Sequence, residues 1–173
     1  GHAWSFDNQV NGYLGSKEAP PGTPRDVGQR AIWIEQIGLA ALKPIGPRKV
    51  LIDGGVEPAK NPIWIEGPHL YERGGWYYLS DAEGGTGPQH PQVVLRRRDI
   101  QGPYEAYAHN PILTQRDLPA HRPAPVTTAG HAALAPAPDG RSWAVFPPRP
   151  PSYRHPYNPG PPTSPSPAPC PDP

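Results

Sequence analysis

Prolines and glycines interrupt this chain so often that a long regular element has little room to form. The 173 residues include 30 prolines and 19 glycines. Proline removes a backbone N–H donor and clashes with the preceding helical turn, and glycine weakens the interior of helices and strands. No segment carries a convincing helical pattern, whereas short apolar runs recur between turn residues. The sequence therefore predicts an all-β fold made of short strands.

The clearest strand signal is an aromatic hairpin centred on Gly74 and Gly75. Apolar runs at 70–71 and 76–79 flank the two glycines, which accept the positive φ angles of a tight turn. Residues 1–30 are expected to be rich in loops, with a hint of a strand only at 13–14. Further strands are expected at 31–37, 49–53, 92–96, 127–134 and 142–146. Repeated short meanders of this kind are typical of the blades of a β-propeller.

Composition divides the chain at residue 146. Residues 1–146 carry the strand pattern and form one expected domain, whereas in 147–173 roughly every second residue is proline. Because the tail has no apolar period, we expect it to be disordered or polyproline II. Its origin has two explanations: a shifted reading frame in a GC-rich gene, or a genuine proline-rich linker or SH3 ligand. Reading the DNA in its other two frames tests the first explanation. If neither frame continues the pattern of residues 22–146 in the way that related sequences do, that explanation is refuted.

Charge, cysteine content and hydropathy exclude several classes of function. The net charge is +1 and the only basic run is 96–98, so we expect no nucleic-acid partner. The single cysteine, Cys170, lies in the tail and cannot support a disulfide framework. No apolar stretch approaches the roughly 18 residues of a membrane span. The missing initiator Met indicates an incomplete chain, and the compartment stays open.

Glu66 is the residue whose setting most suggests chemistry. It stands at the entry to the aromatic hairpin, among Trp64, Ile65, Pro68 and Tyr71. A carboxyl group in such surroundings loses hydration, which favours its protonated form, as a general acid requires. The alternative is an ordinary solvated charge at the beginning of a strand.

A series of short motifs runs in order along residues 22–146. They occupy 30–34, 42–46, 64–71, 82–86 with His90, 102–105, 110–114, 129–132 and 143–146. In order and spacing they resemble glycoside hydrolase family 43, the five-bladed β-propeller enzymes that include β-xylosidases and α-L-arabinofuranosidases. The resemblance implies a partial propeller, with about half of one blade, one whole blade and the opening of another.

The resemblance also implies a function. Glu66 matches the general acid of an inverting glycosidase that removes terminal xylosyl or arabinofuranosyl units from oligosaccharides or polysaccharides of the xylan or arabinan type. The family's base and its pKa-tuning Asp are expected outside this chain, so the isolated chain is expected to be inactive. We assign no catalytic role to Asp7, Asp53 or Asp81, and expect turn capping and solvation for the last two. The alternative is a non-catalytic carbohydrate-binding or interaction propeller.

Three further residues take roles from the resemblance. Glu83 and Thr86 match a segment that approaches the sugar pocket, although a plain tight turn is the alternative. His131 matches a Gly-His dipeptide whose histidine faces the propeller channel and in many members contacts calcium or an ordered water. Calcium prefers oxygen ligands, and Ala133 replaces the family's Asp, so a structural histidine is the other interpretation. The resemblance implies no required cofactor, with a structural calcium ion as the one candidate.

Overall fold

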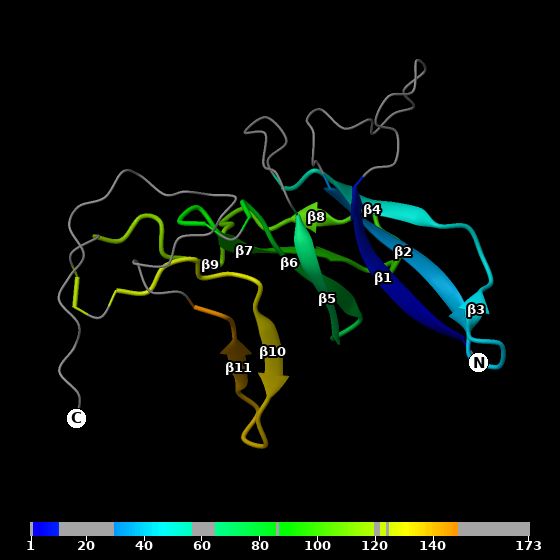
Figure 1. Cartoon of the computed structure of the whole chain (residues 1–173). Coiled ribbons are helices and arrows are strands. Elements are labelled where there is room, and N and C mark those ends of the chain that lie inside the picture. The colour runs from blue at the N-terminus through cyan, green and yellow to red at the C-terminus, as the bar shows by residue number, and fades with distance from the viewer. Residues whose placement is uncertain are drawn as a thin grey trace, which may run out of the picture.

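The computed structural model describes residues 2–10, 30–56, 65–85, 87–119, 122–123 and 125–148, and within 2–10 the side chains of residues 3–5 only. These described residues form strands and turns and contain no helix, which confirms the all-β prediction (Figure 1). Among them, no helix has the length and apolar character needed to cross a membrane. The strands are β1 (His2–Val10), β2 (Arg30–Gly38), β3 (Lys43–Pro44), β4 (Lys49–Asp53), β5 (Glu66–Arg73), β6 (Trp76–Ala82), β7 (Pro91–Arg97), β8 (Glu105–Ala106), β9 (Leu113–Thr114), β10 (Ala133–Pro136) and β11 (Ser142–Val145).

The first sheet has the order β1-β2-β3, with β4 paired to β2. Strand β1 runs antiparallel along the whole of β2, from His2 opposite Gly38 to Val10 opposite Arg30. The expectation of a loop-rich start is therefore wrong for residues 2–10. The polar run at 7–9 gives little local strand signal, and pairing with a strand about 30 residues away supplies the backbone hydrogen bonds instead. The strand hint at 13–14 lies outside the described residues.

The second sheet has the order β5-β6-β7-β8, with β9 paired to β7. The predicted aromatic hairpin is confirmed, because β5 and β6 pair antiparallel up to Arg73 opposite Trp76. Gly74 and Gly75 form the turn with φ angles of 60° and 73°. Both angles lie in the left-handed region that glycine adopts at low cost. This meander is the largest sheet of the described structure.

The third sheet consists of β10 and β11 and lies to one side of the two larger sheets (Figure 1). Its first strand is shorter than the predicted strand at 127–134. Thr128 and His131 have φ angles of 56° and 54°, which break the extended backbone before residue 133. The sheet is joined to β5 where the Leu134 N–H donates to the Tyr71 hydroxyl, at 2.7 Å.

The hydrophobic core lies between the two larger sheets. Ile32, Ile34 and Leu51 come from β2 and β4, and they pack with Leu79 of β6 and with Ile65. Ile65 and Leu79 have no exposed surface. Fully burying a side chain of this size contributes roughly 1.5–3 kcal/mol. This core therefore fixes where β5 begins, one residue after Ile65.

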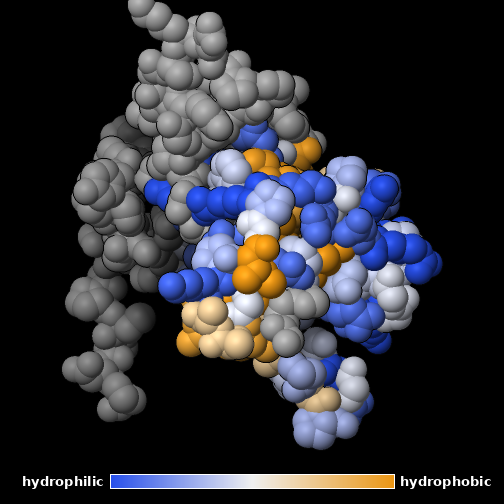
Figure 2. Space-filling model, turned by 90° about the vertical axis from the view of Figure 1, so that its right-hand side faces the viewer, coloured by the Kyte–Doolittle hydropathy of each residue, from blue (hydrophilic) through white to orange (hydrophobic). Residues whose placement is uncertain are grey.

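Hydrophobic side chains also remain on the surface. The face shown in Figure 2 is largely hydrophilic, with hydrophobic groups gathered in small patches. The β10–β11 sheet contributes several of the exposed apolar residues, since Leu134, Trp143 and Val145 are 40%, 60% and 63% exposed. This two-stranded sheet buries little of its own apolar surface and depends on neighbouring structure for order.

Asp81 is a buried carboxyl group in the meander that lacks a hydrogen-bond partner in the described structure. It has no exposed surface, and neither of its carboxylate oxygens has a hydrogen-bond partner in the described structure. The expectation that Asp81 is solvated is therefore wrong. In β6 it follows Ser80 and alternates onto the same face as the core residue Leu79. Burial, and secondarily the charge of Glu83, raise the pKa of Asp81 well above its usual value.

The buried Asp81 predicts an unusual pH dependence of stability. Because its pKa is raised in the folded state, the fold holds this proton more tightly than the unfolded chain does. The Asp81 carboxyl group therefore contributes its full stabilisation below the unfolded-state pKa of 3.8. This stabilisation is lost as the pH rises from there through the raised pKa of the folded state. We expect Asp81→Val to raise the free energy of unfolding at pH 7 by about 1–3 kcal/mol and to weaken the pH dependence. Urea denaturation followed by tryptophan fluorescence measures both.

The matched control is Asp117→Asn, because the Asp117 side chain is 79% exposed. This change is expected to leave the stability within about 0.5 kcal/mol of the wild type. Loss of stability at pH 7 in Asp81→Val would contradict the prediction.

Candidate active site

Glu66 opens strand β5 directly after the buried Ile65 and pairs with Ala82 of β6. The register of the β5–β6 ladder shifts between Glu66 and His69, so the strand is irregular at its start. The Glu66 side chain is 20% exposed. The carboxyl group is thus neither solvated on an open surface nor sealed in the core, and it can meet a ligand.

His131 lies beside the Glu66 carboxylate. Its Nδ1 atom is 3.9 Å from Glu66 Oε1, and 44% of its side chain is exposed. The imidazole ring rests against the backbone of Gly67, where a Cβ atom would come within 2.6 Å of the His131 Cδ2 atom. Only glycine at position 67 lets the ring come this close, which explains the Glu-Gly pair in physical terms.

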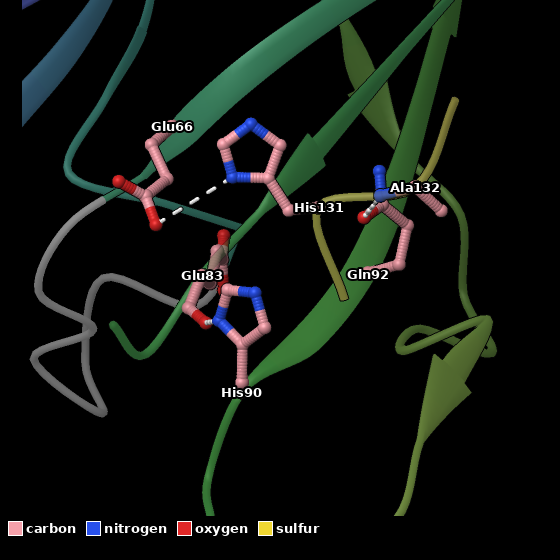
Figure 3. A network of polar contacts seen from close by, with 6 residues as sticks. All are labelled: Glu66, Glu83, His90, Gln92, His131 and Ala132. Atoms are coloured by element: carbon pink, nitrogen blue, oxygen red, sulfur yellow. Dashed lines mark hydrogen bonds and ion pairs between the residues drawn. The ribbon is translucent and has the colours of Figure 1, made fainter. Parts of the chain in front are cut away.

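His90 completes a group of three side chains that point toward one another (Figure 3). Its ring is 2% exposed, and its Nδ1 atom lies 3.0 Å from the carbonyl oxygen of Glu83. That carbonyl oxygen can only accept, so Nδ1 is the donor in this contact. Burial lowers the pKa of His90, and the charge of Glu66 acts in the opposite direction. The sequence analysis included His90 in the motif with residues 82–86 and predicted no role for its side chain.

Glu83 lies near the three side chains, and its own carboxylate is engaged elsewhere (Figure 3). The Val56 N–H donates to Glu83 Oε1 at 2.6 Å, and the Glu83 side chain is 6% exposed. Gly84 and Gly85 follow with φ angles of 76° and 63°, so a tight turn is present as well. Thr86, the other residue expected near a sugar, lies outside the described residues.

Gln92 holds the loop that carries His131. Its side-chain oxygen accepts from the Ala132 N–H at 2.8 Å, and its amide nitrogen donates to Ser80 Oγ at 2.8 Å. Gln92 is 1% exposed, so both hydrogen bonds form away from water. The sequence placed Gln92 in a strand but held no signal for this role, because its loop partner lies 40 residues away.

The donor atoms of this group do not fit a calcium ion. Glu66, His90 and His131 each offer one ligand atom, and these atoms lie within 4.8 Å of one another. Two of the three are imidazole nitrogens, whereas calcium takes six to eight oxygen ligands. In the part of the chain that the structure describes, the position of His131 therefore suits an ion pair with Glu66 better than a calcium site.

A half-buried carboxyl group close to two imidazoles, at the first residue of an antiparallel strand, is a candidate acid–base site in an all-β protein. The family model described as glycosyl hydrolases family 43 matches residues 4–164. The chain belongs to this family, which its motifs had indicated.

Individual relatives and solved structures agree with that assignment. The chain is 42% identical over 114 residues to xylosidase/arabinosidase 43B of Humicola insolens, covering 66% of this chain and 20% of that protein. A GH43_12 structure from a capybara gut metagenome matches with a TM-score of 0.65 and 36% identity, over 81% of this chain and 26% of that one. The xylan beta-1,4-xylosidase of Bacillus halodurans C-125 matches with a TM-score of 0.64 and 30% identity, over 83% of this chain and 24% of that one. The chain thus spans about a quarter or less of the length of these proteins.

The bridging role of Gln92 generates a prediction. Gln92→Leu leaves the buried Ala132 N–H without its acceptor, so we expect a loss of about 1–3 kcal/mol in the free energy of unfolding. Amide hydrogen exchange at Ala132 should become faster than in the wild type, because the loop opens more readily. Exchange monitored by NMR or mass spectrometry measures the effect.

Gln101→Leu is the matched control, since Gln101 is exposed in a turn. It is expected to leave Ala132 exchange unchanged. If the Ala132 amide exchanges equally slowly in Gln92→Leu and in the wild type, the prediction is wrong and other contacts hold the loop.

Proposed function

We propose that Glu66 is the general acid of an inverting glycoside hydrolase that removes terminal xylosyl or arabinofuranosyl units. The supporting observation is the half-buried Glu66 carboxylate, 3.9 Å from His131 Nδ1 in a family 43 chain. Other carboxylates described in the structure suit the role less well. Asp81 is fully buried without a partner, and Asp117 and Asp139 are exposed beside arginines.

The proposed chemistry needs two carboxyl groups. Glu66 gives its proton to the departing glycosidic oxygen, while a carboxylate on the opposite face of the sugar activates a water, roughly 6.5–9.5 Å away. The base and the pKa-tuning Asp are expected in parts of the enzyme that this chain does not cover. His131 and His90 position the acid and shield it on one side. The substrate is a xylan-type or arabinan-type saccharide, in keeping with the names of the relatives, and Glu83 and Thr86 are proposed to lie near it.

We further propose that the three sheets belong to successive blades of a five-bladed propeller. The five-stranded sheet supplies the whole blade, the four-stranded sheet belongs to the blade before it, and β10–β11 opens the next. Residues 1–146 form the partial propeller, and 147–173 form the proline-rich tail. Since a propeller closes through contacts between its first and last blades, this chain is proposed to be inactive alone.

The alternative, a propeller that binds carbohydrate without cleaving it, would use exposed aromatic faces. Trp64 lies outside the described residues. Trp76 is covered by arginines, with the Arg96 and Arg98 guanidinium carbons 4.7 Å and 4.3 Å from its ring centroid. Arginine stacking occupies ring surface that a sugar would need. This observation favours the catalytic proposal.

A chimera tests the role of Glu66. Residues 65–90 replace the aligned segment of the Humicola insolens relative, which supplies the remaining blades. If the chimera hydrolyses an aryl xyloside or arabinofuranoside, Glu66→Gln is expected to lower kcat by about 10²–10⁴. The loss should shrink for aryl leaving groups of low pKa, because they depart without a proton. Steady-state kinetics over a series of aryl glycosides measure this.

Glu72→Gln is the matched control, because Glu72 is exposed in the same strand and accepts from the Gly75 N–H at 3.0 Å. It is expected to keep the chimera's rate. An equal kcat for the chimera and its Glu66→Gln variant, over the whole series of leaving groups, would count against the acid role. The unmodified chain should hydrolyse nothing above buffer, and a rate there that Glu66→Gln abolishes would contradict its proposed inactivity.

A further inference from the structure

The turn end of the aromatic hairpin carries three arginines on one face of the five-stranded sheet. Arg73 pairs with Trp76 across the hairpin turn, so both side chains lie on the same face. Arg96 pairs with Tyr78, two residues along from Trp76, which places Arg96 on that face as well. Arg98 follows two residues later and contacts the Trp76 ring. The arginine cluster, formed by Arg73, Arg96 and Arg98, is exposed to solvent.

Trp76 holds two guanidinium groups of the arginine cluster in place. The Arg96 and Arg98 Cζ atoms lie 4.7 Å and 4.3 Å from its ring centroid. A cation over the face of an indole is attracted to it, and the planar guanidinium suits such stacking better than an ammonium group does. Two groups of the same charge are therefore fixed beside one half-buried ring, although they repel each other.

The carboxylates of the neighbouring strands and turns do not neutralise the arginine cluster. Glu105 pairs with Arg97 at 2.7 Å. Glu72 and Asp99 accept hydrogen bonds from backbone N–H groups of the adjoining turns. In the part of the chain that the structure describes, the three arginines of the cluster form no ion pair. Their N–H donors are therefore available to an anion from outside the chain.

We propose that the arginine cluster binds the carboxylate groups of an acidic saccharide, namely those of uronic acid residues. A guanidinium fork matches a carboxylate through two parallel N–H···O bonds, so oriented arginines recognise this group by shape as well as by charge. The choice of a saccharide rests on the family, glycosyl hydrolases family 43. A nucleic acid fits less well, because the net charge is only +1 and arginines cover the Trp76 ring that could stack on a base.

The arginine cluster lies at the opposite end of β5 from Glu66. Glu66 begins this eight-residue strand and Arg73 ends it. The two residues are therefore roughly 20 Å apart along the strand. The proposed saccharide site is thus separate from the candidate active site and uses none of its residues. It can fail while the catalytic proposal stands, and the reverse also holds.

The test uses the full 173-residue chain and a tetramer of galacturonic acid, with xylotetraose as the neutral ligand of equal length. Isothermal titration calorimetry at low and raised salt measures the affinities. One working variant, Arg96→Gln/Arg98→Gln, removes both charges. The other, Arg96→Lys/Arg98→Lys, keeps the charges and removes the guanidinium forks. Far-UV circular dichroism checks that each variant folds.

Arg141→Gln is the matched control. Arg141 also lies over a tryptophan, with its Cζ atom 5.6 Å from the Trp143 ring centroid, but it already pairs with Asp139 at 2.7 Å. An arginine whose charge is met by a carboxylate of the same chain is expected to contribute little to the binding of an external anion.

We expect the tetramer of galacturonic acid to bind at least about tenfold more tightly than xylotetraose, and raised salt to weaken its binding. The glutamine variant should lose at least about tenfold in affinity. The lysine variant should lose at least about threefold, because an ammonium group cannot form the paired hydrogen bonds. Arg141→Gln should match the wild type.

Three results would overturn the proposal. If the tetramer does not bind, or binds the glutamine variant as tightly as the wild type, the arginine cluster is not its site. Equal affinity of the lysine variant and the wild type would show that charge alone attracts the ligand. Tighter binding of inorganic phosphate or of a short single-stranded oligonucleotide than of the tetramer would overturn the choice of ligand.

Discussion

The apolar contact between the two larger sheets supports every other feature of the structure. Ile32 and Ile34 of β2 meet Leu79 of β6 and Ile65, which directly precedes Glu66. A shift of one residue in the β5 register would exchange the places of Ile65 and Glu66, sending the carboxyl group into the core. The burial of one isoleucine therefore determines that the glutamate emerges at the end of the sheet, where a ligand can reach it.

A second, polar constraint brings the remote loop to this carboxylate. The loop before β10 contains two non-glycine residues with positive φ, Thr128 and His131, and regular strand pairing cannot hold such a backbone. The buried Gln92 amide holds it instead, through the Ala132 N–H. A hydrogen bond in a low-dielectric interior is strong, and its loss leaves a buried donor unsatisfied. The position of His131 thus depends on the Gln92 side chain, which bonds the residue next to it.

The catalytic role proposed for Glu66 requires a second carboxyl group. Glycoside hydrolysis needs a second carboxylate on the far side of the sugar, and the chain spans about a quarter or less of the relatives in which such a pair would be assembled. This chain contributes to that pair the half-buried glutamate, with two imidazoles close to it.

Local chemistry in the sequence was sufficient to predict the all-β fold, the Gly74–Gly75 hairpin and the glutamate at its entry, because turns and alternating strands depend on near neighbours. It could not reveal strand β1, the buried state of Asp81 or the roles of His90 and Gln92. Each of these depends on a partner or an interface distant in sequence, such as the 40 residues between Gln92 and Ala132. The sequence by itself determined which residues are able to do chemistry. Only the tertiary structure decided which of them meet, because the packing of sheets and one buried amide set the distances between them.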